Sequence, residues 1–263
     1  MTWLNISDEA YFNEFRSYIS STDIRRLLRS PAHFRNPAVV DTPATQFGTL
    51  AHAFILLPGD AEARYRPRAD VDGRTKEGKA TREWEANLAA NQGVKFVSAA
   101  DYNAAVSIAS SIRTHLGATS ILTSGVAEVS GIANDFLGIN ARIKPDYRTD
   151  AHIVDVKTCS DARATGFIRS VMTYEYCVQA AYYCDVAESI DGKKRDFYWV
   201  AVEKDAPYAV AVYKASDEML EYGRQQYKRA IEIYKECSAL DLWPSYSQQI
   251  QELTLPIWAK DLT

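Results

Sequence analysis

The chain has 263 residues, of which 47% are hydrophobic, and its formal net charge at pH 7 is −4. This length and apolar content can supply a substantial core, which argues against an intrinsically disordered protein. The acidic balance argues against a protein that coats nucleic acid non-specifically, but it leaves room for a nucleic-acid enzyme whose acids hold metal ions.

Several features predict an intracellular chain. The first residues, "MTWLNISDEA", lack the basic and apolar regions of a secretory signal peptide, and no apolar run is long enough to span a bilayer. The four cysteines show no CxxC spacing, so we expect free, buried thiols. They are Cys159, Cys177, Cys184 and Cys237. We therefore expect a cytoplasmic protein.

The N-terminal half is mostly helical in pattern. We expect a helix over 21–29 that ends at Ser30 and Pro31, a buried helix over 49–57 and another helix over 99–116. Residues 66–85 predict an exposed loop that enters a helix near Thr81. With no repeat or linker, we expect a single domain: an N-terminal helical elaboration (1–47), a core (48–240) and a tail (241–263).

The second half adds short segments rich in β-branched residues. "GVAEVSGIA", "FLGINARIKPD" and "HIVDVKT" predict three consecutive strands joined as antiparallel hairpins. A helix over 169–190, two strands over 195–204 and 208–216, and an amphipathic helix over 216–240 follow. This order predicts an α/β fold with a central mixed β-sheet of about five strands flanked by helices.

Two acids and a lysine stand close together in the predicted strands. Asp155 and Lys157 are two residues apart, so they project from the same face of their strand. Asp146 ends the preceding strand, and the turn between them is short. A hairpin therefore brings Asp146 close to Asp155 and Lys157, in a register that the sequence leaves open.

Two converging carboxylates suit Mg²⁺ or Mn²⁺, because these hard cations prefer oxygen ligands and remove the repulsion between the acids. The ammonium of Lys157 can hold an attacking water and stabilise a charged transition state. The alternative is an ion pair between Asp155 and Lys157 that only joins two strands.

Four other residues could belong to the same site. Glu128, in the first predicted strand, could add a carboxylate or could be a surface residue. Gln179 and Tyr183 share one helix face, either toward the site or as ordinary half-buried polar groups. His52 is a metal ligand if its helix packs on the sheet, and otherwise a satisfied core histidine.

Two basic groups are candidates for phosphate contacts, since arginine binds phosphate through a bidentate fork. The first lies in the helix over 21–29, and the second lies in the loop over 66–85. Their members are Arg25, Arg26 and Arg29 in the first group and Arg74, Lys76 and Lys79 in the second. A solvated helix face or loop is the alternative for each.

Eight segments, taken together and in this order, resemble the PD-(D/E)xK nuclease superfamily. Within it, the chain resembles the exonuclease VIII (RecE-type) nucleases of phages and prophages. The segments are "SSTDIRRLLRSPAHFR", "GTLAHAFILLPGD", "RTKEGK", "AEVSG", "ARIKPD", "HIVDVKT", "VQAAYY" and "LTLPIWAK". The resemblance implies a restriction-endonuclease-like core and a Mg²⁺-dependent exonuclease, with Mn²⁺ as an alternative ion. Such an enzyme degrades one strand of linear duplex DNA from its 5′ end to 5′-mononucleotides and leaves 3′ overhangs.

The resemblance also implies roles for residues of this chain. His52, Asp146 and Asp155 match metal ligands, together with the backbone carbonyl of Val156, and Lys157 matches the catalytic lysine. Three further positions match an acidic strand residue and a QxxxY motif: Glu128, Gln179 and Tyr183. No iron–sulfur cluster is expected, because the first cysteine is Cys159.

Partners follow from the same resemblance. They are linear double-stranded DNA, a RecT-type single-strand annealing protein, and further copies of the chain in a ring-shaped oligomer. Three alternatives remain: an endonuclease on the same fold, a catalytically inactive DNA-binding protein, and an enzyme that uses Lys157 as a Schiff-base nucleophile.

Overall fold

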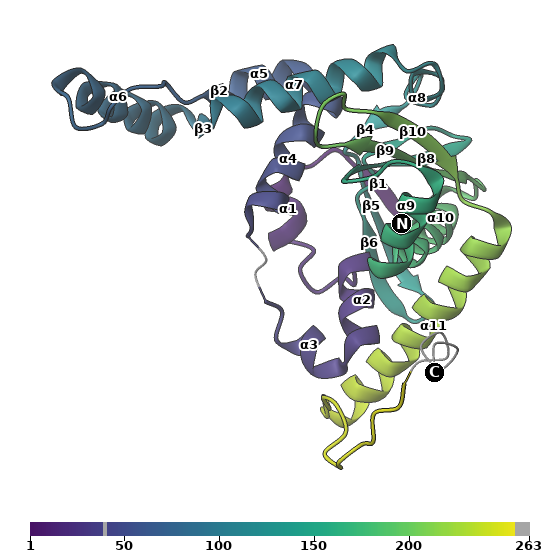
Figure 1. Ribbon diagram of the computed structural model, residues 1–263. Coiled ribbons are helices and arrows are strands. Elements are labelled where there is room, and N and C mark those ends of the chain that lie inside the picture. Colours follow the sequence, from purple (N-terminus) through teal and green to yellow (C-terminus); the bar gives the residue numbers. More distant parts are fainter. Residues whose placement is uncertain (39–40, 256–263) are drawn as a thin grey trace.

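The computed structural model describes residues 1–38 and 41–255 (Figure 1). Most of the "LTLPIWAK" segment, residues 256–260, lies outside the described residues. Within the described residues, the centre of the molecule is a five-stranded mixed sheet with the order β10-β9-β8-β7-β4. The strands are β4 (Val126–Ala127), β7 (Tyr147–Arg148), β8 (His152–Cys159), β9 (Asp196–Glu203) and β10 (Val210–Lys214). Only the β8–β9 pair is parallel among these strands. The predicted α/β class and mixed sheet are confirmed.

The two central strands are apolar on both faces because helices cover both. Val154 and Val156 of β8 pack on one side with Ile108 and Ile112 of α7 (Ala99–Thr114). On the other side, Ile153, Phe197 and Trp199 pack with residues of α10 (Tyr176–Asp191). Continuous apolar runs of this kind are typical of parallel strands covered on both faces. Asp155 shares the face that points toward α10, since side chains alternate along a strand.

Two helices connect β8 to β9 where the sequence predicted one over 169–190. They are α9 (Ala164–Thr173) and α10 (Tyr176–Asp191). Glu175, between them, has φ 55°, a left-handed conformation that interrupts the helix. After β10, the long helix α11 (Asp217–Leu240) packs against α10, close to the predicted range.

The three predicted consecutive strands are in fact divided between two sheets. A second sheet contains β1 (Thr2–Leu4), β5 (Ser130–Phe136) and β6 (Ile139–Ile143) in the order β1-β5-β6. The chain passes from one sheet to the other between β4 and β5 and again between β6 and β7. At the first crossing Glu128 has φ 56°, and at the second Pro145 cannot donate a ladder hydrogen bond. The amide of Glu128 donates to the carbonyl of Asp146 (3.1 Å) and joins the two crossings.

This division corrects two predictions. Glu128 does not lie within a strand but between β4 and β5, and Asp146 lies between β6 and β7 rather than at the end of one strand. The N-terminal segment also supplies β1 to the second sheet in addition to its helices.

Four helices lie in the chain before residue 58. They are α1 (Asp8–Asn13), α2 (Ser21–Arg29), α3 (Pro31–Arg35) and α4 (Pro43–Leu56). A capping box between Ser20 and Asp23 begins α2, and the extended Ser30 ends it, as predicted. The helix predicted over 49–57 starts earlier, at Pro43, where Thr42 caps it. α2 packs against α10 and α11, and α4 lies over β8.

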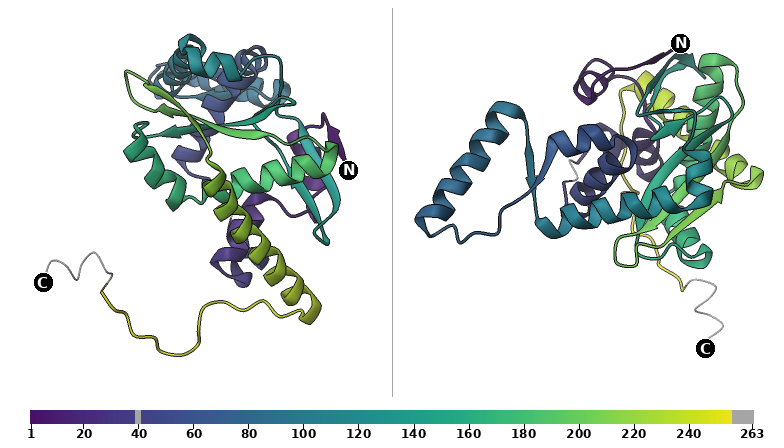
Figure 2. Two further views of the ribbon diagram at one scale, coloured as in Figure 1. Left: turned by 90° about the vertical axis from the view of Figure 1, so that its right-hand side faces the viewer. Right: turned by 90° about the horizontal axis from the view of Figure 1, so that it is seen from above.

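Residues 58–97 form an extension that projects from the central sheet (Figures 1 and 2). It contains α5 (Pro58–Arg64), β2 (Tyr65–Pro67), α6 (Lys76–Gln92) and β3 (Lys95–Val97), with β2 and β3 parallel. The prediction of a helix start near Thr81 was wrong, because Thr75 caps α6 and the helix begins at Lys76. Gly78 is needed there, since a Cβ would lie 1.9 Å from the carbonyl oxygen of Asp72. Beyond β3, α7 and the short α8 (Leu116–Ile121) return to the sheet.

Other predictions concern the cysteines and membrane insertion. All four cysteines lie in the described residues and are buried and unpaired, which confirms the prediction of free, buried thiols. None of the helices in the described residues combines the length and apolarity that crossing a membrane requires.

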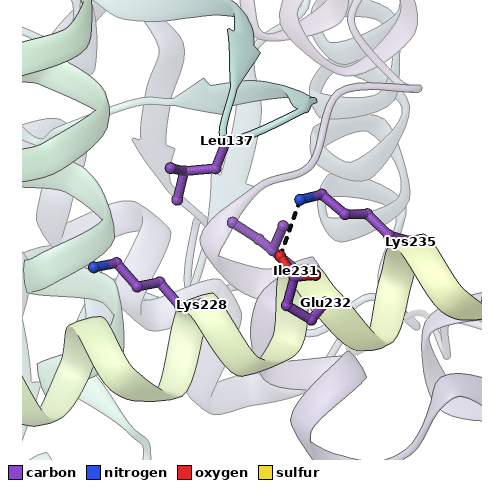
Figure 3. A pocket seen from close by; sticks show the side chains of 5 residues that line it. All are labelled: Leu137, Lys228, Ile231, Glu232 and Lys235. Carbon is purple, nitrogen blue, oxygen red and sulfur yellow. Dashed lines mark hydrogen bonds and ion pairs between the residues drawn. The ribbon is translucent and has the colours of Figure 1, made fainter.

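A hollow of about 350 Å³ lies between α11 and the β5–β6 turn and contains none of the predicted site residues (Figure 3).

Candidate active site

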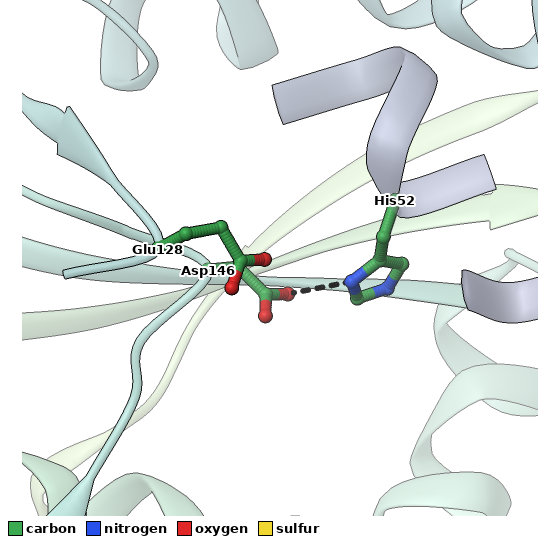
Figure 4. A group of neighbouring side chains, drawn as sticks. All are labelled: His52, Glu128 and Asp146. Atoms are coloured by element: carbon green, nitrogen blue, oxygen red, sulfur yellow. Dashed lines mark ion pairs between the residues drawn. The ribbon is translucent and has the colours of Figure 1, made fainter. Parts of the chain in front are cut away.

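Three potential metal ligands meet where the chain passes between the two sheets. His52 of α4, Glu128 and Asp146 each offer a ligand atom, and these atoms lie within 4.8 Å of one another (Figure 4). His52 Nδ1 is 3.5 Å from Asp146 Oδ2. Glu128 and Asp146 reach this point because each occupies one of the two crossings, while α4 brings His52 from the opposite side.

The hairpin register, which the sequence left open, places Asp146 next to β8. Tyr147 pairs with Val154, so the chain before Tyr147 runs alongside the next residues of β8. The backbone amide of Val156 donates to Asp146 Oδ2 (2.6 Å). On the same residue, the carbonyl oxygen of Val156 lies 2.8 Å from His52 Nε2. Val156 therefore contacts two of the predicted ligands, Asp146 and His52, through its backbone.

Asp155 and Lys157 form a buried ion pair on the α10 face of β8. Their Oδ2 and Nζ atoms are 2.6 Å apart, and the side chain of Asp155 is only 2% exposed. Gln179 of α10 contacts both groups: its Nε2 donates to Asp155 Oδ1 (3.0 Å), and its Oε1 accepts from Lys157 Nζ (3.3 Å). These two contacts fix the orientation of the Gln179 amide.

Two residues around the site, Lys144 and Tyr176, were not singled out in the sequence analysis. Lys144 Nζ lies 2.9 Å from Glu128 Oε2 and also contacts Asp8. Tyr183 donates to the carbonyl of Lys144 (3.4 Å). The Tyr176 ring lies under the ammonium of Lys157, with 4.6 Å between the nitrogen and the ring centroid. Tyr176 is three residues before Gln179 on α10, so helical spacing could have identified it.

Burial and neighbouring charges shift two pKa values at the centre of the site. Burial raises the pKa of Asp146 to about 6, with further increases from Asp155 and Glu128 and an opposing effect of His52. Burial alone would lower the pKa of Lys157, but Asp155 and Asp146 outweigh it and raise that pKa above its ordinary value. At neutral pH, Asp146 is therefore mostly ionised and Lys157 remains charged.

Comparisons with known proteins agree with this arrangement of elements. Residues 20–256 match the family model described as a PDDEXK-like domain of unknown function (DUF3799). The chain belongs to this PDDEXK-like family. No curated protein matches the chain significantly.

Two solved structures are similar to the PDDEXK-like chain. A protein from Eubacterium rectale, described as a "putative exonuclease", is 15% identical, with a TM-score of 0.66 over 99% of this chain and 98% of that one. At this identity, the likeness supports the fold alone. An alkaline exonuclease from Laribacter hongkongensis is 13% identical, with a TM-score of 0.33 over 89% of this chain and 96% of that one.

The donor set of this PDDEXK-like site fits a hard divalent cation. Two carboxylates and an imidazole form the cluster, and carboxylate oxygens suit Mg²⁺ or Mn²⁺. Asp155 Oδ2 is buried and, among the described residues, has no hydrogen bond of good geometry, although the ammonium of Lys157 is close. The sequence predicted His52 with Asp146 and Asp155, whereas the cluster joins His52 and Asp146 with Glu128.

The two basic groups lie in different parts of the molecule. In α2, Arg25 reaches the helix junction before α10 and donates to the carbonyl of Tyr174 (3.2 Å). Its neighbours are occupied elsewhere: Arg26 pairs with Asp23 (3.1 Å), and Arg29 donates to the hydroxyl of Tyr246 (3.2 Å). The second group lies in the extension that projects from the sheet, at the start of α6 (Figure 1). It comprises Arg74, Lys76 and Lys79.

Proposed function

We propose that this chain is a divalent-metal-dependent exodeoxyribonuclease that removes nucleotides from the 5′ end of one strand of linear duplex DNA. The products are 5′-mononucleotides and 3′ overhangs. One observation carries the nuclease proposal. Asp146 and the ion pair of Asp155 and Lys157 lie on one hairpin, and the Val156 amide, between Asp155 and Lys157, donates to Asp146. The family resemblance supports the polarity.

Lys157 acts as a positive charge and a hydrogen-bond donor. Because its pKa is raised, the ammonium stays protonated at neutral pH and cannot serve as a general base. It is placed to orient a water molecule and to stabilise the charge that develops on the phosphate. The same protonation disfavours a Schiff-base mechanism, which requires a neutral amine.

Four side chains would hold the cation: His52, Glu128, Asp146 and Asp155. A bound divalent ion would supply Lewis acidity, which polarises the phosphate and lowers the pKa of the attacking water. Gln179 contacts both Asp155 and Lys157, so it positions these two groups without contacting the cluster itself. Tyr183 supports the opposite side through the carbonyl of Lys144.

The biological setting is proposed on the resemblance. We place the enzyme in the cytoplasm of a bacterial host, encoded by a phage or prophage, as a ring-shaped homo-oligomer on linear duplex DNA. The 3′ overhangs would pass to a RecT-type annealing protein for recombination. The single-domain division into residues 1–47, 48–240 and 241–263 belongs to the same proposal.

Digestion of end-labelled DNA tests this function. Linear duplexes labelled at the 5′ or the 3′ end, and a covalently closed circle, are incubated with Mg²⁺, with Mn²⁺ or with EDTA. We expect rapid release of the 5′ label as a mononucleotide, slow loss of the 3′ label, an intact circle and no reaction in EDTA. Cleavage of the circle would instead identify an endonuclease. A protein that binds the DNA but releases no label and leaves the circle intact would be a DNA-binding protein without catalysis.

A further inference from the structure

A stack of aromatic rings leads from the core to the surface beside Lys157, and the proposed mechanism leaves its outer end unused. Phe167, which is buried, contacts the ring of Tyr176 at 6.4 Å between centroids. Tyr174 stacks on Tyr176, at 5.6 Å and an interplanar angle of 27°. Tyr174 is 56% exposed. The ring under the Lys157 ammonium is therefore followed directly by a ring that faces solvent.

The backbone at Tyr174 is held in place from two sides. Glu175, between the two tyrosines, has φ 55°, a left-handed conformation that is strained for a non-glycine residue. Arg25 donates to the carbonyl of Tyr174 (3.2 Å). The left-handed residue ends α9 and starts α10 in a way that lets the two flanking tyrosines stack. Strained backbone conformations of this kind cluster at functional sites, which indicates that the position of the exposed Tyr174 ring matters.

The helix that ends before Tyr174, α9, exposes two apolar side chains. Met172 and Ile168, four residues apart on α9, are 50% and 43% exposed. An exposed planar ring, stacked on the ring that lies under the Lys157 ammonium, suits a flat ligand that carries a phosphate. A nucleotide combines these two properties: its phosphate would lie at Lys157, and its base would lie on the aromatic face.

We propose that Tyr174 is a stacking platform for a nucleobase of the DNA strand whose phosphate lies at Lys157. The proposal rests on the proposed nuclease function and adds how the strand is held. A base that stacks on a side chain has left the duplex, so the platform binds an unpaired end nucleotide. Stacking accepts any base, because every base has a π-face, so the platform requires no particular sequence.

The test measures binding of single-stranded DNA in EDTA, where no strand is cut. 2-Aminopurine is placed at the first, second or third nucleotide from the 5′ end, and quenching of its fluorescence identifies the stacked position. We expect Tyr174→Ala to abolish this quenching and to weaken binding by about 5- to 150-fold, the range for one stacked base. Tyr174→Phe, which keeps the ring, should bind within about twofold of the wild type.

An abasic nucleotide at the quenched position completes a double-mutant cycle. If the base stacks on Tyr174, the wild type loses affinity for the abasic strand, and Tyr174→Ala loses no more. The proposal is overturned if Tyr174→Ala weakens binding of the normal strand and of the abasic strand by the same factor. It is also overturned if 2-aminopurine is quenched at none of the three positions. Tyr222→Ala, which removes a tyrosine that is 46% exposed on α11, is the matched control and should retain the quenching.

Three other outcomes separate this inference from its alternatives. If Tyr174→Ala dissociates an oligomer in light scattering while DNA affinity per subunit is unchanged, the apolar surface joins copies of the chain, and the platform is refuted. If the wild type never cuts DNA but the cycle shows coupling, the nuclease proposal fails alone. If the wild type cuts DNA and the cycle is additive, the platform fails alone.

Discussion

Replacing Asp146 with asparagine should stabilise the metal-free protein at pH 8. Burial raises the pKa of Asp146 from 3.8 to about 6, so folding favours its protonated form. A carboxyl group with a raised pKa contributes stability at low pH, and that contribution is lost as the pH rises through about 6. Two pKa units correspond to about 3 kcal/mol. Asparagine is uncharged at every pH and keeps an oxygen that can accept from the Val156 amide.

Urea unfolding in EDTA, from pH 4 to pH 8, measures this effect. We expect Asp146→Asn to equal the wild type near pH 4 and to exceed it by about 3 kcal/mol at pH 8. In thermal unfolding, the increase in Tm should be roughly 5–10 °C for a domain of this size. Adding Mg²⁺ should then stabilise the wild type but have little effect on the variant, since binding to the native state raises stability.

Asp161→Asn is the control with the opposite sign. A side-chain hydrogen bond from Arg163 lowers the pKa of Asp161, so its charge stabilises the fold above its unfolded pKa, and the variant should lose stability at pH 8. If Asp146→Asn is as stable as the wild type or less stable at pH 8 in EDTA, Asp146 is not a carboxylate strained by burial. Charge repulsion and burial would then give no reason for a cation at Asp146.

Three further predictions follow from the same geometry. Calorimetric Mg²⁺ affinity should fall about tenfold per pH unit below pH 6, because protons compete for Asp146, and a flat profile would contradict this. Gln179→Ala should lower kcat by roughly 10- to 100-fold with little change in unfolding free energy, since it positions Asp155 without contacting the cluster; wild-type kcat would refute this role. Arg25→Glu should weaken the binding of DNA with a 5′-phosphorylated end, and flatten the salt dependence of that binding, more than Arg74→Glu does. The reason is that Arg25 lies by the site, whereas Arg74 lies in the extension. The reverse order in anisotropy titrations would assign the phosphate to the extension.

The central pair of the site could be predicted from spacing. Asp155 and Lys157 share a strand face because side chains alternate, and the short turn after Tyr147 restricts where Asp146 can lie. Helical spacing predicted that Gln179 and Tyr183 share one face, but it left open whether that face points toward the site. These inferences rest on local geometry, which a sequence specifies well.

The crossing between the two sheets could not be predicted. Glu128 and Pro145 interrupt segments with strand composition, and whether such a segment continues or bends depends on what packs against each half. The metal cluster depends on both bends, so the place of Glu128 beside His52 required the structure. The early start of α6 was missed because the mixed charges around Lys76 show no apolar face.

The rate of nucleotide release from linear duplex DNA with Mg²⁺ tests the central claim most directly. The comparison includes the wild type, Lys157→Ala, and Lys235→Ala, which removes a surface lysine on α11. We predict a fall of at least about 10²- to 10³-fold for Lys157→Ala, the cost of losing one transition-state donor, with DNA binding retained and Lys235→Ala at the wild-type rate. A Lys157→Ala variant that degrades DNA at the wild-type rate would contradict the account.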